Sequence, residues 1–116
     1  MKKGVDMEAL YKIIEALSPP RIEILRLLLD NKPRYVSEIA KAINLSRTAT
    51  AYHLDVLEDI GLVVHEYKVI KEPSSTGKLG SFYRINWEKL KEVLETLEKL
   101  QKLFAMASSQ KVKTEP

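Results

Sequence analysis

The sequence predicts a mainly α fold with a small β-hairpin, and three observations lead to this prediction. Five segments carry apolar residues at the spacing of an amphipathic helix, and two short runs of strand formers lie between the fourth and the fifth. The third observation is a stretch rich in Pro, Ser and Gly that separates the two runs. With 116 residues and 45% hydrophobic content, the chain can bury one core. We expect one domain over residues 1–107 and a flexible tail over residues 108–116.

Two helices are expected before residue 30. The first, over residues 6–17, has one apolar face, which comprises Met7, Leu10, Ile14 and Leu17. Ser18 is a plausible N-cap for the second helix, because Pro19 and Pro20 would occupy its first turn, where a missing amide hydrogen is harmless. This helix should continue to about Leu29. Its apolar residues surround most of the axis, which favours a central position in the core.

Residues 36–64 are typical of two helices joined by a tight turn and followed by a strand; their sequence is VSEIAKAINLSRTATAYHLDVLEDIGLVV. Ile39, Ala40 and Ile43 fall at helical spacing, and the small Ala40 would let the second helix approach closely. Residues 34–35 are expected to form a short strand just before this segment. The order of these elements is that of a helix-turn-helix, a motif that presents its second helix to the major groove of DNA.

The second helix of this motif concentrates polar chemistry in its N-terminal half. The candidate DNA contacts on it are Ser46, Arg47, Thr48, Thr50, Tyr52 and His53. Ser46 is also a plausible N-cap. We expect Arg47 to contact a base edge, because a guanidinium can bind guanine through two hydrogen bonds. Thr50 could instead pack against the first helix of the motif, and Tyr52 or His53 could contact phosphate without reading sequence.

The predicted hairpin pairs residues 62–70 with residues 82–85, and the connection between them is long enough to project from the body as a wing. The whole chain has a net charge of only +3. The hairpin nevertheless sets four basic residues against Glu72, namely Lys68, Lys71, Lys78 and Arg84. Lys78, at the glycine-flanked tip, should approach phosphate or the minor groove, and the other three should add attraction that does not depend on sequence.

A long helix is expected from Trp87 onward, with apolar residues at alternating spacings of three and four through Ala107. It has more apolar surface than a small domain can cover, so we expect two copies of the chain to pair through it, assisted by the first helix. The predicted dimer interface comprises Met7, Leu10, Ile14, Leu90, Val93, Leu94, Leu97, Leu100 and Phe104. The alternative is an ordinary amphipathic helix folded back on its own domain.

The stretch SRTATAYHLDVLEDIGLV resembles the winged-helix regulators of the ArsR family, and the similarity extends over about residues 7–105. The residues that stand where this family usually places a Ser, a His-Leu pair, a Leu and Gly-Leu-Val are Ser46, His53-Leu54, Leu57 and Gly61-Leu62-Val63. Archaeal regulators of this type are similar, and MarR-like regulators share much of the pattern. The resemblance implies a winged helix-turn-helix with long N- and C-terminal dimerisation helices, which acts as a DNA-binding repressor.

The sequence departs from the metal-sensing members of that family. Those members resemble one another in a cysteine-containing stretch at the entrance of the recognition domain, or in Asp and His ligands on the terminal helix. Here the entrance is RYVSE at residues 34–38, the predicted terminal helix has no Asp or His, and the chain has no cysteine. We therefore expect neither a bound metal nor another cofactor.

Catalysis is not expected, because the chain lacks a nucleophile-base set, a phosphate-binding glycine loop and a metal cluster. No run of about 18 uncharged apolar residues exists, and the start of the chain is charged, so we expect a cytoplasmic protein without a membrane partner. The expected partners are double-stranded DNA and a second copy of the chain, with room at the dimer interface for an unknown small-molecule effector. The alternative is a winged-helix protein-interaction module of a transcription or repair assembly.

Overall fold

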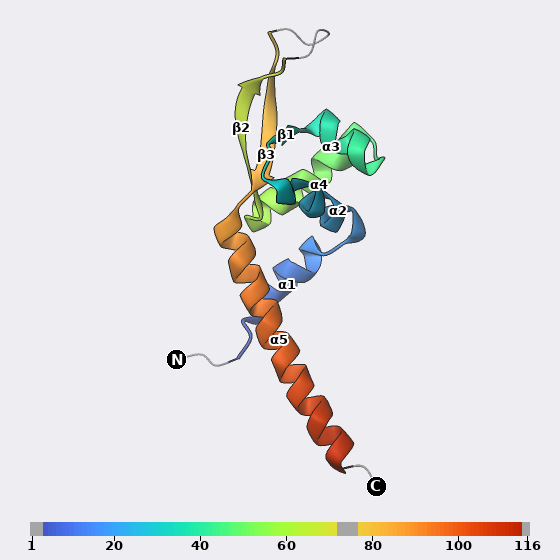
Figure 1. The fold of residues 1–116 in the computed structure, drawn as a ribbon, viewed down its shortest axis with the longest axis vertical. Helices are drawn as coiled ribbons and strands as arrows, with labels where there is room; N and C mark the ends of the chain where they lie inside the picture. The colour runs from blue at the N-terminus through green and yellow to red at the C-terminus, as the bar shows by residue number, and fades with distance from the viewer. Residues whose placement is uncertain (1–3, 72–76, 115–116) are drawn as a thin grey trace.

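The computed structural model describes residues 4–71 and 77–114, with side chains described as far as Gln110. Its elements in chain order are α1 (Met7–Ala16), α2 (Pro19–Leu27), η1 (Leu28–Asp30), β1 (Arg34–Tyr35), α3 (Val36–Ile43), α4 (Arg47–Ile60), β2 (Val63–Val69), β3 (Leu79–Ile85) and α5 (Trp87–Thr114). A body of short helices carries a β-hairpin at one end, and α5 leaves at the other (Figure 1). The predicted winged helix-turn-helix architecture is confirmed.

Local caps set the ends of α1 and α4. The predicted cap at Ser46 is confirmed, whereas the side chain of Ser18, predicted to cap α2, makes no capping hydrogen bond. Asp6 Oδ1 accepts hydrogen bonds from two amides in the first turn of α1, at 3.0 and 3.3 Å. Ser46 Oγ accepts one from the Ala49 amide at 3.1 Å, which caps α4. At the other end of α4, Gly61 adopts a left-handed φ of 95°. That conformation turns the chain from α4 into β2.

The second helix is shorter and less enclosed than predicted. It ends at Leu27, where the 3-10 turn η1 takes over. Ile22 and Leu29 are exposed, whereas Arg21 is buried, so the expectation of an apolar helix enclosed on most sides is wrong. The Arg21 guanidinium donates a hydrogen bond to the Glu15 carbonyl near the end of α1, which accounts for its inward position.

The three strands form one antiparallel sheet in the order β1-β3-β2. β2 and β3 pair from Val63 opposite Ile85 to Val69 opposite Leu79. β3 therefore begins three residues earlier than the predicted run at Phe82–Ile85, and the hairpin connection is correspondingly shorter. The Ile70 side chain packs over Gly80, where a Cβ would lie 2.6 Å from Ile70 Cδ1.

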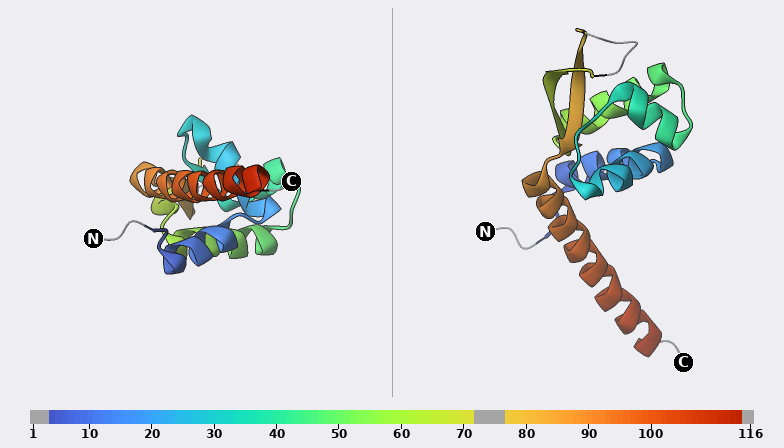
Figure 2. Two further views of the ribbon diagram at one scale, coloured as in Figure 1. Left: turned by 90° about the horizontal axis from the view of Figure 1, so that it is seen from below. Right: turned by 45° about the horizontal axis from the view of Figure 1, so that its top comes forward.

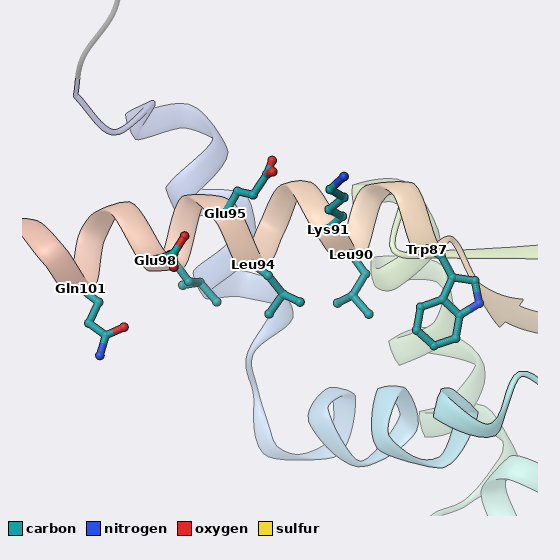
Figure 3. Close-up of a pocket in the computed structure, with 8 residues that line it drawn as sticks. Trp87, Leu90, Lys91, Leu94, Glu95, Glu98 and Gln101 are labelled. Atoms are coloured by element: carbon teal, nitrogen blue, oxygen red, sulfur yellow. The ribbon is translucent and has the colours of Figure 1, made fainter.

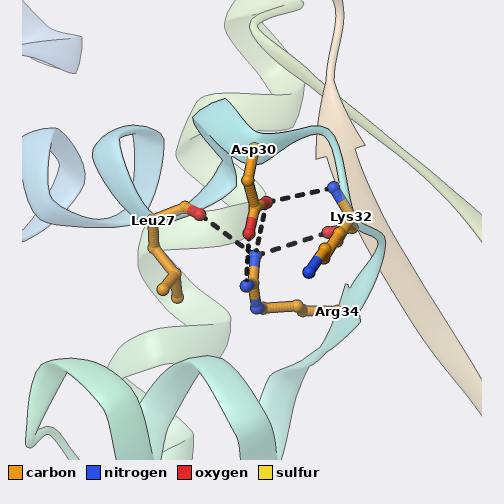
Figure 4. Close-up of polar contacts among 4 residues, drawn as sticks. All are labelled: Leu27, Asp30, Lys32 and Arg34. Atoms are coloured by element: carbon orange, nitrogen blue, oxygen red, sulfur yellow. Dashed lines mark hydrogen bonds and ion pairs between the residues drawn. The ribbon is translucent and has the colours of Figure 1, made fainter.

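The turn between η1 and β1 is held by polar contacts (Figure 4). Arg34 donates to both carboxylate oxygens of Asp30, at 2.9 and 2.7 Å, and to the Leu27 carbonyl at 3.0 Å. Asn31, in a left-handed conformation with φ 63°, accepts a hydrogen bond from Trp87 Nε1 at 3.0 Å. The start of α5 is thereby joined to the same turn as β1.

The core lies where α2, α3 and α4 meet the base of the hairpin. Its largest fully buried side chains are Ile24, Leu28, Ile39, Thr50, Leu54, Leu57, Leu62, Val63 and Ile85. They come from each of these helices, from η1, from β2 and β3 and from the turn before β2. This core holds α4 rigidly beneath the wing.

The terminal helix α5 runs from Trp87 to Thr114, so the expected helix end at Ala107 is wrong. No Gly or Pro interrupts residues 108–114, and nothing in that sequence breaks a helix. All side chains over residues 101–110 are exposed. This half of α5 extends beyond the body in Figure 1 and in the right-hand view of Figure 2.

Candidate nucleic-acid interface

The candidate recognition helix α4 turns its apolar side chains inward and a polar ridge outward. Leu54, Leu57 and Ile60 are buried in the core. The exposed ridge comprises Arg47, Thr48, Tyr52, Asp55 and Asp59. Its N-terminal half is neutral or basic and its C-terminal half is acidic. Only the N-terminal half of the ridge is therefore suited to approach a polyanion.

Thr50 is fully buried, with none of its surface accessible to solvent. Its hydroxyl donates to the Ser46 carbonyl at 2.8 Å. The two possibilities raised for Thr50 were a DNA contact and packing inside the motif, and the geometry supports packing. We therefore remove Thr50 from the candidate DNA contacts, because a side chain without accessible surface cannot reach a ligand.

Tyr52 and His53 point to different surroundings although they are adjacent. Tyr52 is exposed, and the Arg21 guanidinium lies 5.8 Å from its ring centroid. His53 is half-buried, and its Nδ1 has no hydrogen-bond partner in the described part of the chain. Burial lowers the pKa of His53, and the positive charge of Arg21 lowers it further. His53 therefore lies at the edge of the core, while Tyr52 is open to a ligand.

The wing is attached to α4 by a polar contact between two side chains. His65 Nδ1 on β2 meets Glu58 Oε2 on α4, and both side chains are partly buried. The His65 ring also packs between Tyr67 and Tyr83, each at 5.3 Å between centroids. Burial raises the pKa of Tyr83, and the charge of Glu58 raises it further. These contacts fix the angle at which the hairpin stands on α4.

The side chains of two of the four wing cations point to the face of the sheet that is turned away from α4. Successive side chains of a strand alternate between faces, so Arg84 lies opposite the buried Tyr83, and Lys68 lies opposite Tyr67. Lys68 Nζ is also 3.1 Å from Glu66 Oε1 on the same strand. These two cations therefore lie on the same face of the hairpin.

Lys78 and Lys71 line separate hollows. Lys71 shares one with Lys68 and Glu38. Lys78 shares the other, of about 180 Å³, with Arg47. The remaining side chains around this second hollow are Tyr35, Val36, Ser37, Ile70, Leu79, Gly80 and Ser81. Of the four wing cations, Lys78 is thus the one that shares a hollow with Arg47.

Sequence reasoning missed Ser37 and Ser81 as members of the site. Both line the hollow that Arg47 and Lys78 share. Ser37 lies in the first turn of α3, and Ser81 lies on β3. No local pattern marks either residue, because their proximity depends on the register of the hairpin and on the angle at which it meets the helices. Only the tertiary structure places them together.

The predicted dimer interface divides into two groups. Leu10 and Val93 are 8% and 6% exposed, so both belong largely to the chain's own core, and their assignment to a free interface is corrected. Leu90 and Leu97 also pack against that core, and Leu100 is half-buried. The members that remain exposed are Met7, Ile14, Leu94 and Phe104. Further exposed apolar side chains on the same two helices are Tyr11, Leu103 and Met106.

A groove of about 610 Å³ follows the first half of α5. Trp87, Leu90 and Leu94 lie along one side of the helix, facing the connection between α1 and α2, while Lys91 and Glu95 point away from it (Figure 3). Beyond Leu94 the exposed apolar surface continues through Leu103 and Phe104. An unpartnered apolar surface therefore runs along much of α5.

The described residues offer neither a group of metal ligands nor a membrane-spanning helix. Over residues 4–71 and 77–114, no three His, Cys, Asp or Glu side chains gather closely enough to share a metal ion. In that same part of the chain, no helix has the length and apolar content needed to cross a membrane.

The helix-turn-helix lies in a part of the chain that matches a known protein family. Residues 18–64 match the family described as bacterial regulatory protein, arsR family. The matched segment extends from the cap of α2 to the start of β2 and contains the whole helix-turn-helix. Comparison with curated proteins finds no matching sequence.

Solved structures resemble the chain over most of its length. An ArsR-like transcriptional regulator from Rhodococcus sp. RHA1 is 27% identical, with a TM-score of 0.65 and coverage of 94% of both chains. HlyU from Vibrio cholerae is 27% identical, with a TM-score of 0.58 and coverage of 86% of this chain and 97% of that one. A homodimeric winged helix-turn-helix DNA-binding domain from Mycobacterium bovis is 21% identical, with a TM-score of 0.56, and covers 94% of this chain and 86% of its own. This last likeness concerns the fold alone.

Proposed function

We propose that this chain, which carries an arsR-family helix-turn-helix over residues 18–64, is a transcriptional regulator that binds double-stranded DNA as a homodimer. The observation that carries the proposal is the position of the exposed N-terminal half of α4 beside a hairpin with four basic residues. A major groove admits a helix, and the hairpin would then meet the phosphate backbone or the minor groove.

Within this proposal the exposed residues of α4 discriminate between sequences. Thr48 and Tyr52 lie on the outward ridge, where a base edge would be within reach. Arg47 begins the same ridge, and Ser46 and His53 lie beside it. On the wing, Lys78 lines a hollow together with Arg47, while Lys68, Lys71 and Arg84 add attraction to phosphates that does not depend on sequence.

The uncovered half of α5 supports pairing of two copies. Phe104 is 62% exposed and Leu94 is 57% exposed, although both are apolar. Exposed apolar surface of this extent along one helix is typical of an interaction surface. Two copies joined along α5, with Met7 and Ile14 of α1 at the margin, would present two α4 helices to one duplex. A small apolar effector bound at this interface would alter the spacing of the two helices.

Such a dimer would act as a repressor by occupying an operator with two-fold symmetry. The centres of the two half-sites should lie about 34 Å apart, which is one helical turn of DNA. We expect the protein, mixed with genomic fragments and excess random competitor at about 0.15 M salt, to enrich fragments that contain a palindrome. The matched control is a variant with Thr48→Ala and Tyr52→Ala, which should lose the enrichment and keep the fold.

The same selection separates this function from that of a protein-interaction module. An interaction module would retain fragments weakly and without enrichment. Retention without any enriched sequence would therefore contradict the proposal.

A further inference from the structure

We infer that the hollow between α3, α4 and the wing binds one phosphate of the DNA backbone, which Arg47 and Lys78 hold together with Ser37 and Ser81. The inference rests on the proposed function and assigns a specific part of the ligand to specific side chains. It adds two serines that the sequence did not mark and changes the expected role of Arg47.

The charge of the hollow favours an anion. Arg47 on α4 and Lys78 just before β3 both line it, and none of the described residues in its lining is acidic. The neighbouring hollow around Lys68 and Lys71 differs, because Glu38 forms part of its wall. Two cations in one lining create a positive potential that a phosphate diester can neutralise.

The hydroxyl groups around the hollow suit the same ligand. Ser37 and Ser81 each contribute a hydroxyl that can donate to a phosphate oxygen. Val36 and Arg47 begin α3 and α4. Side chains already cap these two helix starts, because Glu38 accepts the Tyr35 amide and Ser46 accepts the Ala49 amide, so the two cations and the two hydroxyl groups carry the site. Cations together with hydroxyl donors suit an anion with several acceptor oxygens, such as a phosphate, and do not suit a metal ion.

The DNA backbone is the favoured source of this phosphate. The hollow is lined by residues of the wing and by the first residue of α4, and a duplex that accepted α4 in its major groove would pass there. Arg47 would then hold the backbone beside the groove. Base discrimination would fall to Thr48 and Tyr52, which lie farther out on the ridge. One phosphate would also tie the wing and the recognition helix to the same point of the duplex.

The test compares how the affinity for an enriched duplex depends on salt in four proteins: the wild type, Arg47→Ala, Lys78→Ala and the double variant. The log of the association constant falls linearly with the log of the salt concentration, and the slope becomes less steep by about 0.9 for each phosphate contact removed. If both side chains hold the same phosphate, the slope should become less steep by about 0.9 in the double variant and by less than that in each single variant. A change in slope of about 0.9 in each single variant and about 1.8 in the double variant would mean that the two side chains contact separate phosphates, and it would overturn the inference.

A second arm locates the phosphate on the DNA. Duplexes in which one phosphate at a time is replaced by an uncharged methylphosphonate should reveal a position where wild-type affinity falls about tenfold. The affinity of the double variant should not change when that phosphate is replaced. The matched control is Lys68→Ala, which changes an exposed lysine that lines a different hollow and should keep the sensitivity. Equal sensitivity of the wild type and the double variant at every position would overturn the inference.

A third arm distinguishes free phosphate from DNA phosphate. Inorganic phosphate is titrated into the DNA-free protein while the amide signals of Ser37 and Ser81 are followed by NMR. Absence of saturation at millimolar concentrations supports the DNA backbone as the source, and saturation below this range would overturn that assignment. Failure of the wild type to bind any duplex selectively would instead contradict the proposed function, so the two failures are distinguishable.

Discussion

Arg34 and Asp30 form a two-point ion pair across the turn that leads into β1, with nitrogen–oxygen distances of 2.9 and 2.7 Å. The Arg34 guanidinium also binds the Leu27 carbonyl at the end of α2. Asn31, between the two partners in sequence, holds the Trp87 indole at the start of α5. One short turn thus positions both the first strand of the sheet and the helix that we propose for dimerisation.

The first prediction concerns the pH dependence of this turn. The hydrogen bonds from Arg34 lower the pKa of Asp30 from 3.8 to about 2. A carboxyl group with a lowered pKa in the folded state stabilises the fold above its unfolded pKa, and that contribution is lost as the pH falls through the folded value. We expect Asp30→Asn to lower the free energy of unfolding at pH 7, and the difference from wild type to narrow between pH 4 and pH 2.

Urea unfolding at several pH values measures this difference. Glu23→Gln is the matched control, because Glu23 pairs with Arg26 at 3.9 Å while both side chains are exposed. It should have little effect at any pH in the series. A constant difference between Asp30→Asn and wild type from pH 7 to pH 2 would show that the ion pair does not contribute through its charge.

The second prediction concerns His53. Burial and the charge of Arg21 hold its pKa below 6.5. In that case the unfolded chain binds a proton before the folded chain does, so stability declines as the pH falls from 6.5 through the folded pKa. We expect His53→Gln, which stays neutral, to remove this part of the decline. Thermal unfolding between pH 7.5 and pH 5 tests it, and an unchanged pH profile in the variant would contradict a lowered pKa.

Short-range signals in the sequence were sufficient for most of the fold. The caps at Asp6 and Ser46 and the left-handed Gly61 act within one helical turn, so the composition around them predicts where α1 and α4 start or end. The end of α5 is different. Its polar last turns lack an apolar period, but they also lack Gly or Pro, and helical propensity alone carries the backbone to Thr114.

The candidate site depended on long-range geometry that a single sequence does not encode locally. Thr50 has the same polar character as Thr48, yet the two point to opposite sides of α4. Leu10 and Val93 match the apolar period of a dimer seam, but α1 packs against α5 and buries both within one chain. Arg47 and Lys78 line the same hollow only because the hairpin returns alongside α3. Periodicity predicts that a face is apolar and does not specify which surface covers it.

The third prediction follows from the burial of Thr50. Thr50→Val keeps the branched shape and removes the hydroxyl that donates to the Ser46 carbonyl. That carbonyl also accepts the Thr50 amide at 3.0 Å, so it keeps a partner. We expect the free energy of unfolding to change by about 1 kcal/mol or less. Base preference in a binding selection should be the same as in wild type, and a shifted preference would restore Thr50 as a DNA contact.

The fourth prediction concerns the uncovered half of α5. Leu103 and Phe104 are exposed in the single chain, and a second copy would cover them. We expect the double variant Leu103→Ser and Phe104→Ser to change the mass in solution from a dimer to a monomer, measured by light scattering after size exclusion. Its helix content should stay close to wild type, because both side chains are largely exposed in the single chain. A monomer presents one recognition helix, so operator affinity should fall by about 10² or more.

Two controls separate pairing from folding. Lys99→Ser and Lys102→Ser change exposed positions on the polar side of the same half of α5, and this pair of substitutions should leave the dimer intact. Val93→Ala removes a side chain buried in the chain's own core and should cost about 2 kcal/mol of folding stability while the folded protein remains dimeric. If the Leu103 and Phe104 substitutions left a dimer with unchanged affinity, pairing through α5 would be ruled out. In that case the apolar surface of this helix would have to serve a partner other than a second copy.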